Sequence, residues 1–492
     1  MDPLMRLQPF IPLHSNETTL SFAGRLAAAH TGQSLTRLLA DMRINTEHFV
    51  LGRPDAISAF AEIAGVGADE LLNATMRGIL GGVEFRSERF HGAFLSRATD
   101  KFCPCCLAED GDRQDWRQRL LWCFAPVHQC PRHGIRLARL AAPARTLQEG
   151  LSHLNLPSDD AATKFLPRYL SWLQSRLDCG SAVDTPWLAS QSIQQVLDAS
   201  LMLGTALTYA LNVRAKTLTA EEQEAAIEHG FIIYSRGAEH VTAAFDTIRA
   251  TSKARAVQAG PLAYYGRLFE WLDRQCNDRD PGPIRDLLRD HIIKHDVIDV
   301  GQVVLGQEAT ERRFHSVQSL SEALRVERRR MSRLLQKLGK VPVGASDAEA
   351  GLLRFEANEI TTLLMDFETA IPMVEVADYI GASLFQMQTL YAEGMIFPIV
   401  PRKARGAVRQ VVFARRSLDA FLAKLSELPL AESENGLDLH PISYVCQRGA
   451  GTTIEVLSAI LAGKLPAFRK PGKHGLAAVV LSPSEALACR TV

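Results

Sequence analysis

The chain has 492 residues, of which 47% are hydrophobic and 22% are charged. This composition is typical of a globular protein with room for several domains and excludes a disordered chain. Lys and Arg together number 55, as do Asp and Glu, and a formal net charge of zero excludes a uniformly basic, histone-like protein. No apolar run approaches the ~18 residues that cross a membrane, and no basic segment followed by an apolar core marks a signal peptide. We therefore expect a cytoplasmic protein that works without a membrane.

The segment 1–150 is expected to form one domain that begins with helices. Phe22 and Leu26 belong to a set of apolar residues that recur at helical spacing. At 56–76, an apolar helix, a small-residue turn at Gly65 and a second helix form a helix-turn-helix pattern. Because most such pairs serve only packing, the pattern leaves DNA contact and packing both open.

The strongest local motif pairs CPCC at 103–106 with CPRH at 130–133. Nine cysteines are too few for a disulfide scaffold in a chain of this length, and their clustering here indicates a metal site. The spacing is C-x2-C, then 23 residues, then C-x2-H, so two ligand pairs on tight turns can converge on one ion. The expected ligands are Cys103, Cys106, Cys130 and His133. The competing ligands are Cys105, Cys123 and His128.

The motif predicts a structural site and not a catalytic one. Zinc prefers a Cys3His set, and four protein ligands leave no open position for a reacting water, so we expect a zinc-ribbon-like site. A zinc deaminase would need H-x-E with P-C-x-x-C, and Ala108 stands where the last cysteine of that signature belongs. Trp116 and Trp122 lie between the ligand pairs in a helical pattern, and we interpret them as core packing over the metal.

Residues 151–300 are expected to form a second, helical domain. A turn-rich stretch at 155–163 indicates a linker, and the pattern from 164 onward is helical apart from a break around Pro281. No motif in this part indicates chemistry. Its expected role is therefore to space and orient the flanking modules.

The last third of the chain contains an internal repeat, with copies at 301–368, 369–430 and 431–492. Each copy has a helix, a small or polar turn, a second helix, a glycine that can stop the helix and a proline that cannot continue it. An extended run and a further helix follow, which is the order of a winged helix. The expected fold class is thus mainly α, with a helical N-terminal domain, a helical middle and tandem winged-helix-like repeats at the C-terminus.

Cations gather at equivalent places in the three copies, with few acids beside them. They lie on the second helix of the first copy, which would enter the major groove, and on the expected wings of the other two. The candidate DNA contacts are Arg328, Arg329, Arg330, Arg333 and Lys337, then Arg402, Lys403, Arg405 and Arg409, then Lys464, Arg469, Lys470 and Lys473. One charge run usually marks a solvated face, whereas three at equivalent positions favour nucleic acid. Docking of a protein stays open for any copy.

Catalytic motifs are absent from the sequence. It contains no Walker A, G-x-S-x-G, H-E-x-x-H or G-x-G-x-x-G pattern. Asp112 and Asp115 are close in sequence but have no third carboxylate at a recognisable distance. We expect a protein that is not an enzyme.

These motifs resemble the TniQ/TnsD family of transposition target-selection proteins, over roughly residues 1–300. The specific part of the resemblance is CPCCLAED, Trp116-Arg117 and the CPRHG block at 130–134. The supporting residues are Pro12, Glu17-Thr18, Ser21-Phe22, Arg25-Leu26-Ala27, Glu224-Ala225-Ala226, Gly230, Tyr264-Tyr265, Leu268 and Trp271-Leu272. Many members carry a further cysteine pair soon after the histidine, which residues 137–142 lack, so a second zinc site of that kind is in doubt.

The resemblance implies an adaptor that recognises an insertion site, either by binding double-stranded DNA or by riding on a CRISPR effector complex. It also implies recruitment of a AAA+ transposition regulator ATPase, and it leaves a homodimer open. Among the site residues it supports only the four zinc ligands, because the DNA-facing arginines are inferred from charge and repeat position. Two other functions stay open: a stand-alone helix-turn-helix transcription regulator, and a metal-dependent enzyme of nucleic acid, against which the four-ligand count argues.

Overall fold

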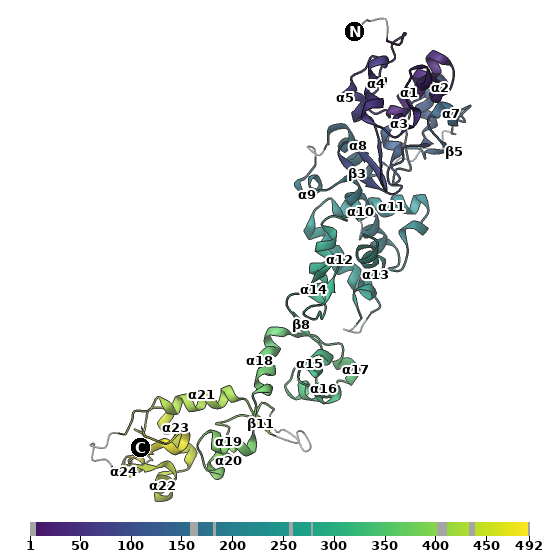
Figure 1. The fold of residues 1–492 in the computed structure, drawn as a ribbon. Helices are drawn as coiled ribbons and strands as arrows, with labels where there is room; N and C mark the ends of the chain where they lie inside the picture. Colours follow the sequence, from purple (N-terminus) through teal and green to yellow (C-terminus); the bar gives the residue numbers. More distant parts are fainter. Residues whose placement is uncertain are drawn as a thin grey trace. The chain divides into compact units, whose positions relative to one another are not determined.

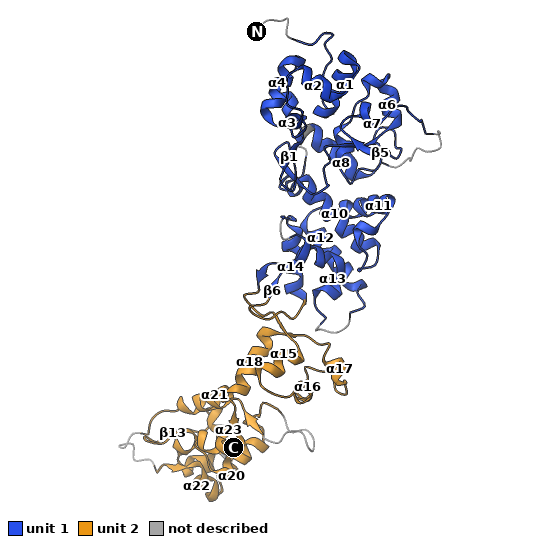
Figure 2. Cartoon of the chain, turned by 45° about the vertical axis from the view of Figure 1, so that its right-hand side comes forward, with its two compact units in different colours: residues 1–254, 259–295, 303–308 blue, residues 255–258, 296–302, 309–492 orange. Residues whose placement is uncertain are grey.

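The computed structural model describes residues 6–157, 166–180, 184–254, 259–276, 279–400, 411–431 and 438–490. These residues are mainly helical, with short strands between the helices (Figure 1). The chain divides into two compact units, the first made of residues 1–254, 259–295 and 303–308 and the second mainly of 309–492 (Figure 2). Within the described ranges, no helix is long and apolar enough to cross a membrane.

The first five helices form the N-terminal core of the first unit. Their bounds are α1 Thr19–Thr31, α2 Leu35–Asp41, α3 Thr46–Val50, α4 Pro54–Ala64 and α5 Ala68–Asn73. Phe22, Phe49 and Phe60 are buried and pack ring against ring. Gly65 ends α4 at a φ of 74°, in the left-handed region that a residue without a Cβ adopts without strain. The helix pair predicted at 56–76 is present, and its second helix ends at Asn73.

Short antiparallel strands and turns follow these helices. Their bounds are β1 Arg77–Ile79, β2 Gly82–Phe85, β3 Glu88–His91, β4 Thr99–Phe102, α6 Pro104–Asp110, η2 Arg113–Asp115, η3 Leu120–Cys123, β5 Ala138–Ala144 and α7 Leu147–Gly150. The first three strands form one sheet, and β4 pairs with β5. Trp116 and Trp122 lie at the 3-10 turns η2 and η3, and the helical stretch expected there is therefore wrong. Both rings are nevertheless buried in the core that contains Cys103, Cys106 and Cys130, as the packing interpretation predicted.

A buried ion pair at the start of α1 lies beside the contact of this helix with the segment between the two cysteine motifs. Arg25 donates to both carboxylate oxygens of Glu17 over 2.9 and 3.0 Å, and the two side chains are 5% and 0% exposed. The hydroxyl of Ser21 donates to the same carboxylate and accepts the backbone N–H of Gln118, at 2.8 Å in both cases. Because each charge needs the other when water is excluded, the pair fixes the start of α1, and the hydrogen bond from Gln118 to Ser21 attaches this part of the helix to the segment.

The remainder of the first unit is helical. Its elements are α8 Arg168–Cys179, α9 Pro186–Ala189, α10 Ile193–Thr208, η6 Ala215–Thr217, α11 Ala220–Tyr234, α12 Ala238–Thr251, α13 Pro261–Glu270, the π-helical turn η7 Trp271–Gln275, α14 Ile284–His295 and a hairpin of β6 Val303–Val304 and β7 Gln307–Glu308. The helices α10 and α11 meet at Gly204 and Gly230, where a Cβ on either glycine would lie 1.8 Å from a backbone oxygen of the other helix. Only glycine allows backbones to approach this closely.

The second unit repeats one order of elements three times: a short strand, two helices, one or two strands and a further helix. The first copy has β8 Phe314–His315, α15 Val317–Ala323, α16 Arg328–Lys337, an additional short helix α17 Asp347–Ala350, β9 Phe355–Glu356 and α18 Ala357–Glu368. The second has β10 Ile371–Pro372, α19 Met373–Tyr379, α20 Leu384–Ala392, β11 Val412–Phe413 and α21 Arg415–Ser426. The third has β12 His440–Pro441, α22 Ile442–Val445, the π-helical turn η8 Cys446–Ala450, α23 Thr453–Leu461, β13 Phe468–Arg469, η9 Gly475–Ala478, β14 Val479–Leu481 and α24 Pro483–Arg490. Whether the copies are winged helices stays a prediction.

The three copies differ in how they bury their apolar side chains. The first has its own core, which includes Met331 and Phe355. The second and third share a single core, in which Phe413 of one copy and Val479 of the other belong to the same cluster. The backbone N–H of Leu476 also donates to a carbonyl of the second copy over 2.9 Å. The domain boundaries stay predictions, but the last two copies pack as one region.

We predict that Arg25→Ala lowers the free energy of unfolding of the first unit by about 3–5 kcal/mol, because it leaves the carboxylate of Glu17 buried and unpaired. Urea unfolding followed by tryptophan fluorescence measures this change, since all five tryptophans belong to the first unit. The control is Arg37→Ala, which removes an exposed pair with Asp41 at 3.2 Å and should cost less than about 1 kcal/mol. Equal losses in the two variants would contradict the structural role of Arg25.

Candidate metal centre and basic surfaces

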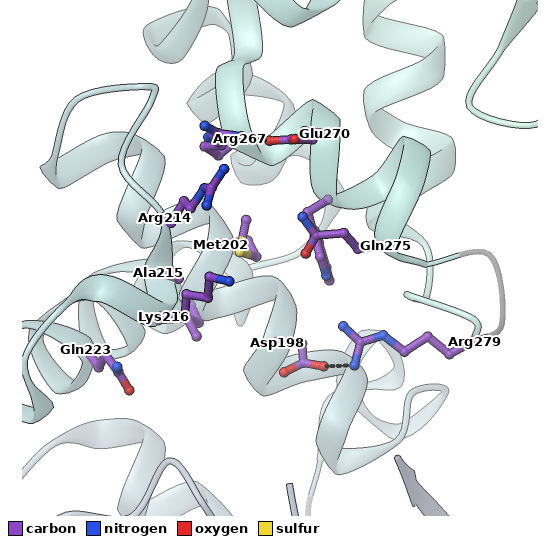
Figure 3. Close-up of a pocket in the computed structure, with 12 residues that line it drawn as sticks. Asp198, Met202, Arg214, Ala215, Lys216, Gln223, Arg267, Glu270, Gln275 and Arg279 are labelled. Atoms are coloured by element: carbon purple, nitrogen blue, oxygen red, sulfur yellow. Dashed lines mark hydrogen bonds and ion pairs between the residues drawn. The ribbon is translucent and has the colours of Figure 1, made fainter. Parts of the chain in front are cut away.

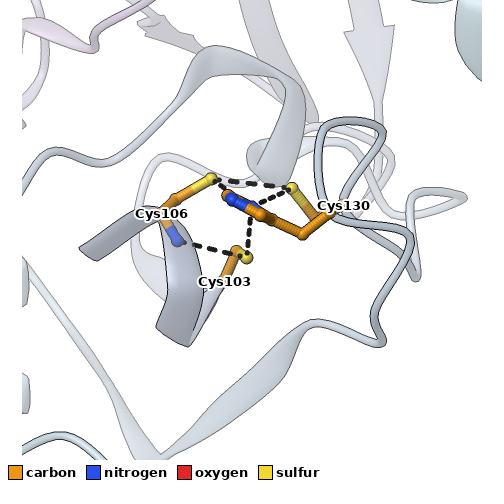
Figure 4. Close-up of side chains that lie close together, drawn as sticks. Cys103, Cys106 and Cys130 are labelled. Atoms are coloured by element: carbon orange, nitrogen blue, oxygen red, sulfur yellow. Dashed lines mark hydrogen bonds between the residues drawn. The ribbon is translucent and has the colours of Figure 1, made fainter. Parts of the chain in front are cut away.

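Four side chains from two distant motifs meet at one point (Figure 4). The Sγ atoms of Cys103, Cys106 and Cys130 and the Nδ1 atom of His133 all lie within 4.8 Å of one another. Nδ1 of His133 is 3.5, 3.3 and 3.7 Å from these three sulfurs in that order, and the sulfurs of Cys106 and Cys130 are 3.6 Å apart. The structure therefore brings together all four residues that the sequence predicted as ligands.

Local backbone geometry presents each ligand pair. Cys103 follows β4 and caps α6, where its sulfur accepts the backbone N–H of Cys106 at 3.5 Å. Cys130 and His133 lie on a turn closed by the N–H of Gly134, which donates to the carbonyl of Cys130 at 2.8 Å. The glycine has a φ of 64°. Pairing of β4 with β5 then brings the two turns to the same end of the module.

The distances fit a tetrahedral ion. Zinc bonds of about 2.3 Å to sulfur and about 2.0 Å to nitrogen place two sulfurs about 3.8 Å apart and a sulfur and a nitrogen about 3.5 Å apart. The observed separations of 3.6 Å between sulfurs and 3.3 to 3.7 Å between sulfur and nitrogen match these edges. The cluster can hold a metal ion without rearrangement.

The competing ligands lie outside the cluster. Cys105 is half-buried and is absent from the group of converging donors. Cys123 is buried against Gln118, and burial raises the pKa of its thiol to about 12. Burial, together with the nearby charges of Lys101 and two arginines, lowers the pKa of His128 to about 4. The converging group contains Cys106, which the x2 spacing favoured over Cys105.

A carboxylate lies next to the ring nitrogen of His133 that faces away from the sulfurs. Nε2 of His133 lies 3.0 Å from Glu109, whose other oxygen is 3.1 Å from Arg132. A metal-bound imidazole gains orientation and basicity when its second nitrogen donates to a carboxylate. Glu109 therefore fixes the tautomer in which Nδ1 faces the sulfurs, a role that the sequence analysis did not assign to it.

The three thiols of the cluster lie so close together that each affects the ionisation of the others. Hydrogen bonds with Cys103 and Cys130, together with burial, raise the pKa of Cys106. Hydrogen bonds from Cys103 and Cys106 lower the pKa of Cys130 despite its burial. The thiolate of Cys130 is thus stabilised, whereas ionisation of Cys106 is disfavoured. Only a cation between the sulfurs allows all three thiols to ionise together.

An ion-pair network continues from the cluster through Asp110, the last residue of CPCCLAED. Its carboxylate is almost fully buried and accepts hydrogen bonds from Arg117 at 3.0 Å and from Arg119 at 2.8 Å. Burial opposes ionisation of this group, but the hydrogen bonds from the two arginines outweigh it and lower the pKa of Asp110. A cavity of about 630 Å³, lined in part by Cys106, Arg117, Arg119 and Arg132, opens beside this network.

The second helix of the first repeat, α16, separates apolar from basic residues. Met331 and Leu335 are buried on one side. The predicted DNA contacts on this helix are all exposed: Arg328, Arg329, Arg330, Arg333 and Lys337. Glu327, the acid in this basic stretch, accepts the backbone N–H groups of Arg329 and Arg330 at 3.1 Å as the N-cap of the helix. Its charge therefore faces the helix end and not the basic side.

The other predicted DNA contacts divide into three groups. The wing cations of the second repeat lie outside the described residues: Arg402, Lys403, Arg405 and Arg409. In the third repeat, Lys464, Lys470 and Lys473 are exposed. Arg469 instead is half-buried and donates through Nε to the carbonyl of Leu428 at 2.7 Å, so it also fixes the chain that follows α21.

The helical middle, where the sequence indicated no chemistry, contains a charged cavity of about 660 Å³ (Figure 3). Four cations and two carboxylates line it: Arg214, Lys216, Arg267, Arg279, Asp198 and Glu270. Arg279 lies 3.2 Å from Asp198, and Arg267 binds Glu270. Arg214 and Lys216 have no ion-pair partner within the part of the chain that the structure describes, so the cavity keeps an excess of positive charge.

A second group of donors also lies in this middle region: Asp246, His291 and His295. The sequence pattern that could have indicated this group is H-x3-H in the last turns of α14, and this pattern is weak on its own. The carboxylate is 45 residues away from His291 on another helix, and sequence spacing does not indicate such a contact.

We predict that Cys106→Ser removes the bound metal and unfolds the module around it, since structural zinc sites contribute roughly 10–16 kcal/mol to folding. Elemental analysis of the purified chain and its thermal unfolding provide the two measurements. The matched control is Cys105→Ser at the neighbouring position, which should keep both the metal and the melting temperature. Loss of metal in both variants, or in neither, would contradict the ligand assignment.

The family comparison matches the part of the chain that holds this centre. Residues 9–137, about a quarter of the chain, match the family model TniQ. A search of curated proteins found no match. The matched range contains α1 to α6, the first four strands and all four residues of the metal cluster. The comparison therefore identifies a TniQ domain at residues 9–137 of the chain.

Proposed function

We propose that the chain is a non-catalytic target-selection factor in DNA transposition. The observation that carries the proposal is the TniQ domain with its closed set of four converging donors. Four protein ligands leave no position for a reacting water, so such a centre serves as a scaffold. The factor recognises an insertion site, directly on DNA or through a CRISPR effector complex, and recruits a AAA+ transposition regulator ATPase.

In this proposal the ion of the cluster is zinc. Three thiolates and one imidazole at tetrahedral separations are the donor set that zinc prefers. The carboxylate of Glu109 at 3.0 Å from the imidazole is the usual support of a zinc-bound histidine. The ion holds together the two turns that the pairing of β4 with β5 brings to one end of the module, and it thereby positions the arginines beside it.

Duplex DNA is the proposed ligand of α16. Its five exposed cations lie on the helix that enters the major groove in helix-turn-helix proteins. The corresponding helices α20 and α23 carry no Lys or Arg. On α20, Leu384 and Phe385 are 59% and 74% exposed, a surface better suited to a protein than to phosphates. We therefore assign DNA contact mainly to the first repeat.

We predict that Arg329→Gln, Arg330→Gln and Arg333→Gln combined weaken binding to duplex DNA and make it less sensitive to salt. Each lost phosphate contact lowers the slope of log affinity against log salt by about 0.9. Fluorescence anisotropy over a series of salt concentrations measures both quantities. The combined lysine variant at the same positions keeps the charge and should keep most of the salt slope. An unchanged slope in the glutamine variant would assign α16 to protein contact instead.

Targeted insertion tests the adaptor role. With the AAA+ regulator and the transposase supplied, omission of this chain should abolish insertion at the selected site, and its addition should restore it. Sequencing of the insertion junctions gives the measurement, and co-purification with the ATPase gives an independent one. Tight binding to a palindromic operator, with insertion unchanged by omission of the chain, would instead support a transcription regulator.

A further inference from the structure

Three potential metal ligands converge at the last turns of α14, far from the cysteine cluster in sequence. His291 and His295 lie four residues apart on this helix, so their rings point to the same side. Asp246 reaches them from α12. Its Oδ1 atom is 2.9 Å from Nε2 of His291 and 3.7 Å from Nε2 of His295. The side chains of Asp246 and His295 are 60% and 25% exposed, and that of His291 is fully buried, so the group opens to solvent on one side.

The hydrogen bond of His295 leaves a lone pair aimed at the carboxylate. Its Nδ1 lies 2.8 Å from the carbonyl of His291, and because a carbonyl only accepts, Nδ1 carries the proton. In the neutral ring, Nε2 is then unprotonated and faces an anionic oxygen of Asp246. Two facing electron pairs repel, and a cation between them removes the repulsion.

An ion at His291 would replace the hydrogen bond of 2.9 Å between its Nε2 and Asp246, while the hydrogen bond of its other nitrogen is kept. Its Nδ1 lies 2.8 Å from the hydroxyl of Tyr265, which also accepts from Arg249 at 3.2 Å. A tyrosine hydroxyl both donates and accepts. The proton of His291 can therefore sit on Nδ1 and face Tyr265, which frees Nε2 for an ion, as the outer partners of metal-binding histidines require.

We propose that Asp246, His291 and His295 bind a divalent first-row transition-metal ion. Two imidazoles and one carboxylate form a donor set for such ions and not for calcium or magnesium, which prefer oxygen alone. Bonds of about 2.1 Å give neighbouring donors a separation between about 3.0 and 3.4 Å, and the observed 2.9 and 3.7 Å bracket this range. Three protein donors leave at least one position for water.

The helix dipole favours a cation at this place, whereas two nearby side chains oppose one. His291 and His295 lie at the C-terminal end of α14, where the dipole is negative. The opposing charges are Lys294 on the same helix and Arg249 on α12. Arg249 is held over the ring of Tyr264, 3.9 Å from its centroid, and donates to the carbonyl of His295. The ion would join α12 to the end of α14, just before the chain enters the second unit at Asp296.

Cobalt titration of the full-length, zinc-loaded chain tests this site. We expect one further equivalent of Co²⁺ to bind with weak visible bands and without the intense charge-transfer absorption of cobalt on thiolates. Binding should raise the unfolding midpoint of the first unit, read from tryptophan fluorescence. Asp246→Asn and His295→Asn, both at solvent-accessible positions, should lower the affinity at least about tenfold, with zinc content and helicity unchanged.

The matched control is His229→Ala, which removes an exposed histidine from the neighbouring helix α11 and should leave cobalt binding intact. Absence of a further equivalent in the wild-type chain would overturn the proposal. It would also be overturned by binding that survives in both ligand variants, because the ion would then sit elsewhere. Neither outcome bears on the cysteine cluster, since the zinc content is measured separately.

Discussion

The structure of the N-terminal domain depends on the need of three crowded sulfurs for a positive charge. Cys103 and Cys106 come from one turn and Cys130 from another, and burial opposes their joint ionisation. A tetrahedral cation would resolve this conflict and cross-link the two turns that the pairing of β4 with β5 brings together. The module between β4 and β5 has little regular structure, and such an ion would add to the small core around the cysteines.

Several of the residues that carry the family resemblance form buried ion pairs and hydrogen bonds around this centre. Glu17 and Arg25 form a buried pair at the start of α1, beside the hydrogen bond between Ser21 and Gln118 that attaches this helix to the module. Asp110 pairs with both Arg117 and Arg119 beside the metal ligands, so one buried carboxylate holds two arginines. These contacts form one network from the first helix to the metal ligands, which gives a fixed arrangement to the surface that a target or partner would meet.

The sequence predicted those parts of the structure whose chemistry is local. The x2 spacings indicated both ligand pairs, and the glycine and proline punctuation indicated the helices of the repeats. The x2 spacing favoured Cys106 over Cys105 without proving the choice, because neighbours on a helix end differ only in direction. The sequence could not indicate the partnership of Asp246 with His291, since that contact depends on how α12 packs against α14. The sequence did not indicate the charged cavity of the middle region either, because that cavity also depends on how the helices pack.

The common core of the second and third repeats has a mechanical consequence. Phe413 and Val479 belong to one cluster, so neither repeat can swing while the other stays still without exposing apolar side chains to water. The outer surfaces of α20 and α23 are thereby kept at a constant separation. A ligand that engages both surfaces must present its two contact points at that spacing. The fixed separation therefore selects ligands by the distance between their contact points.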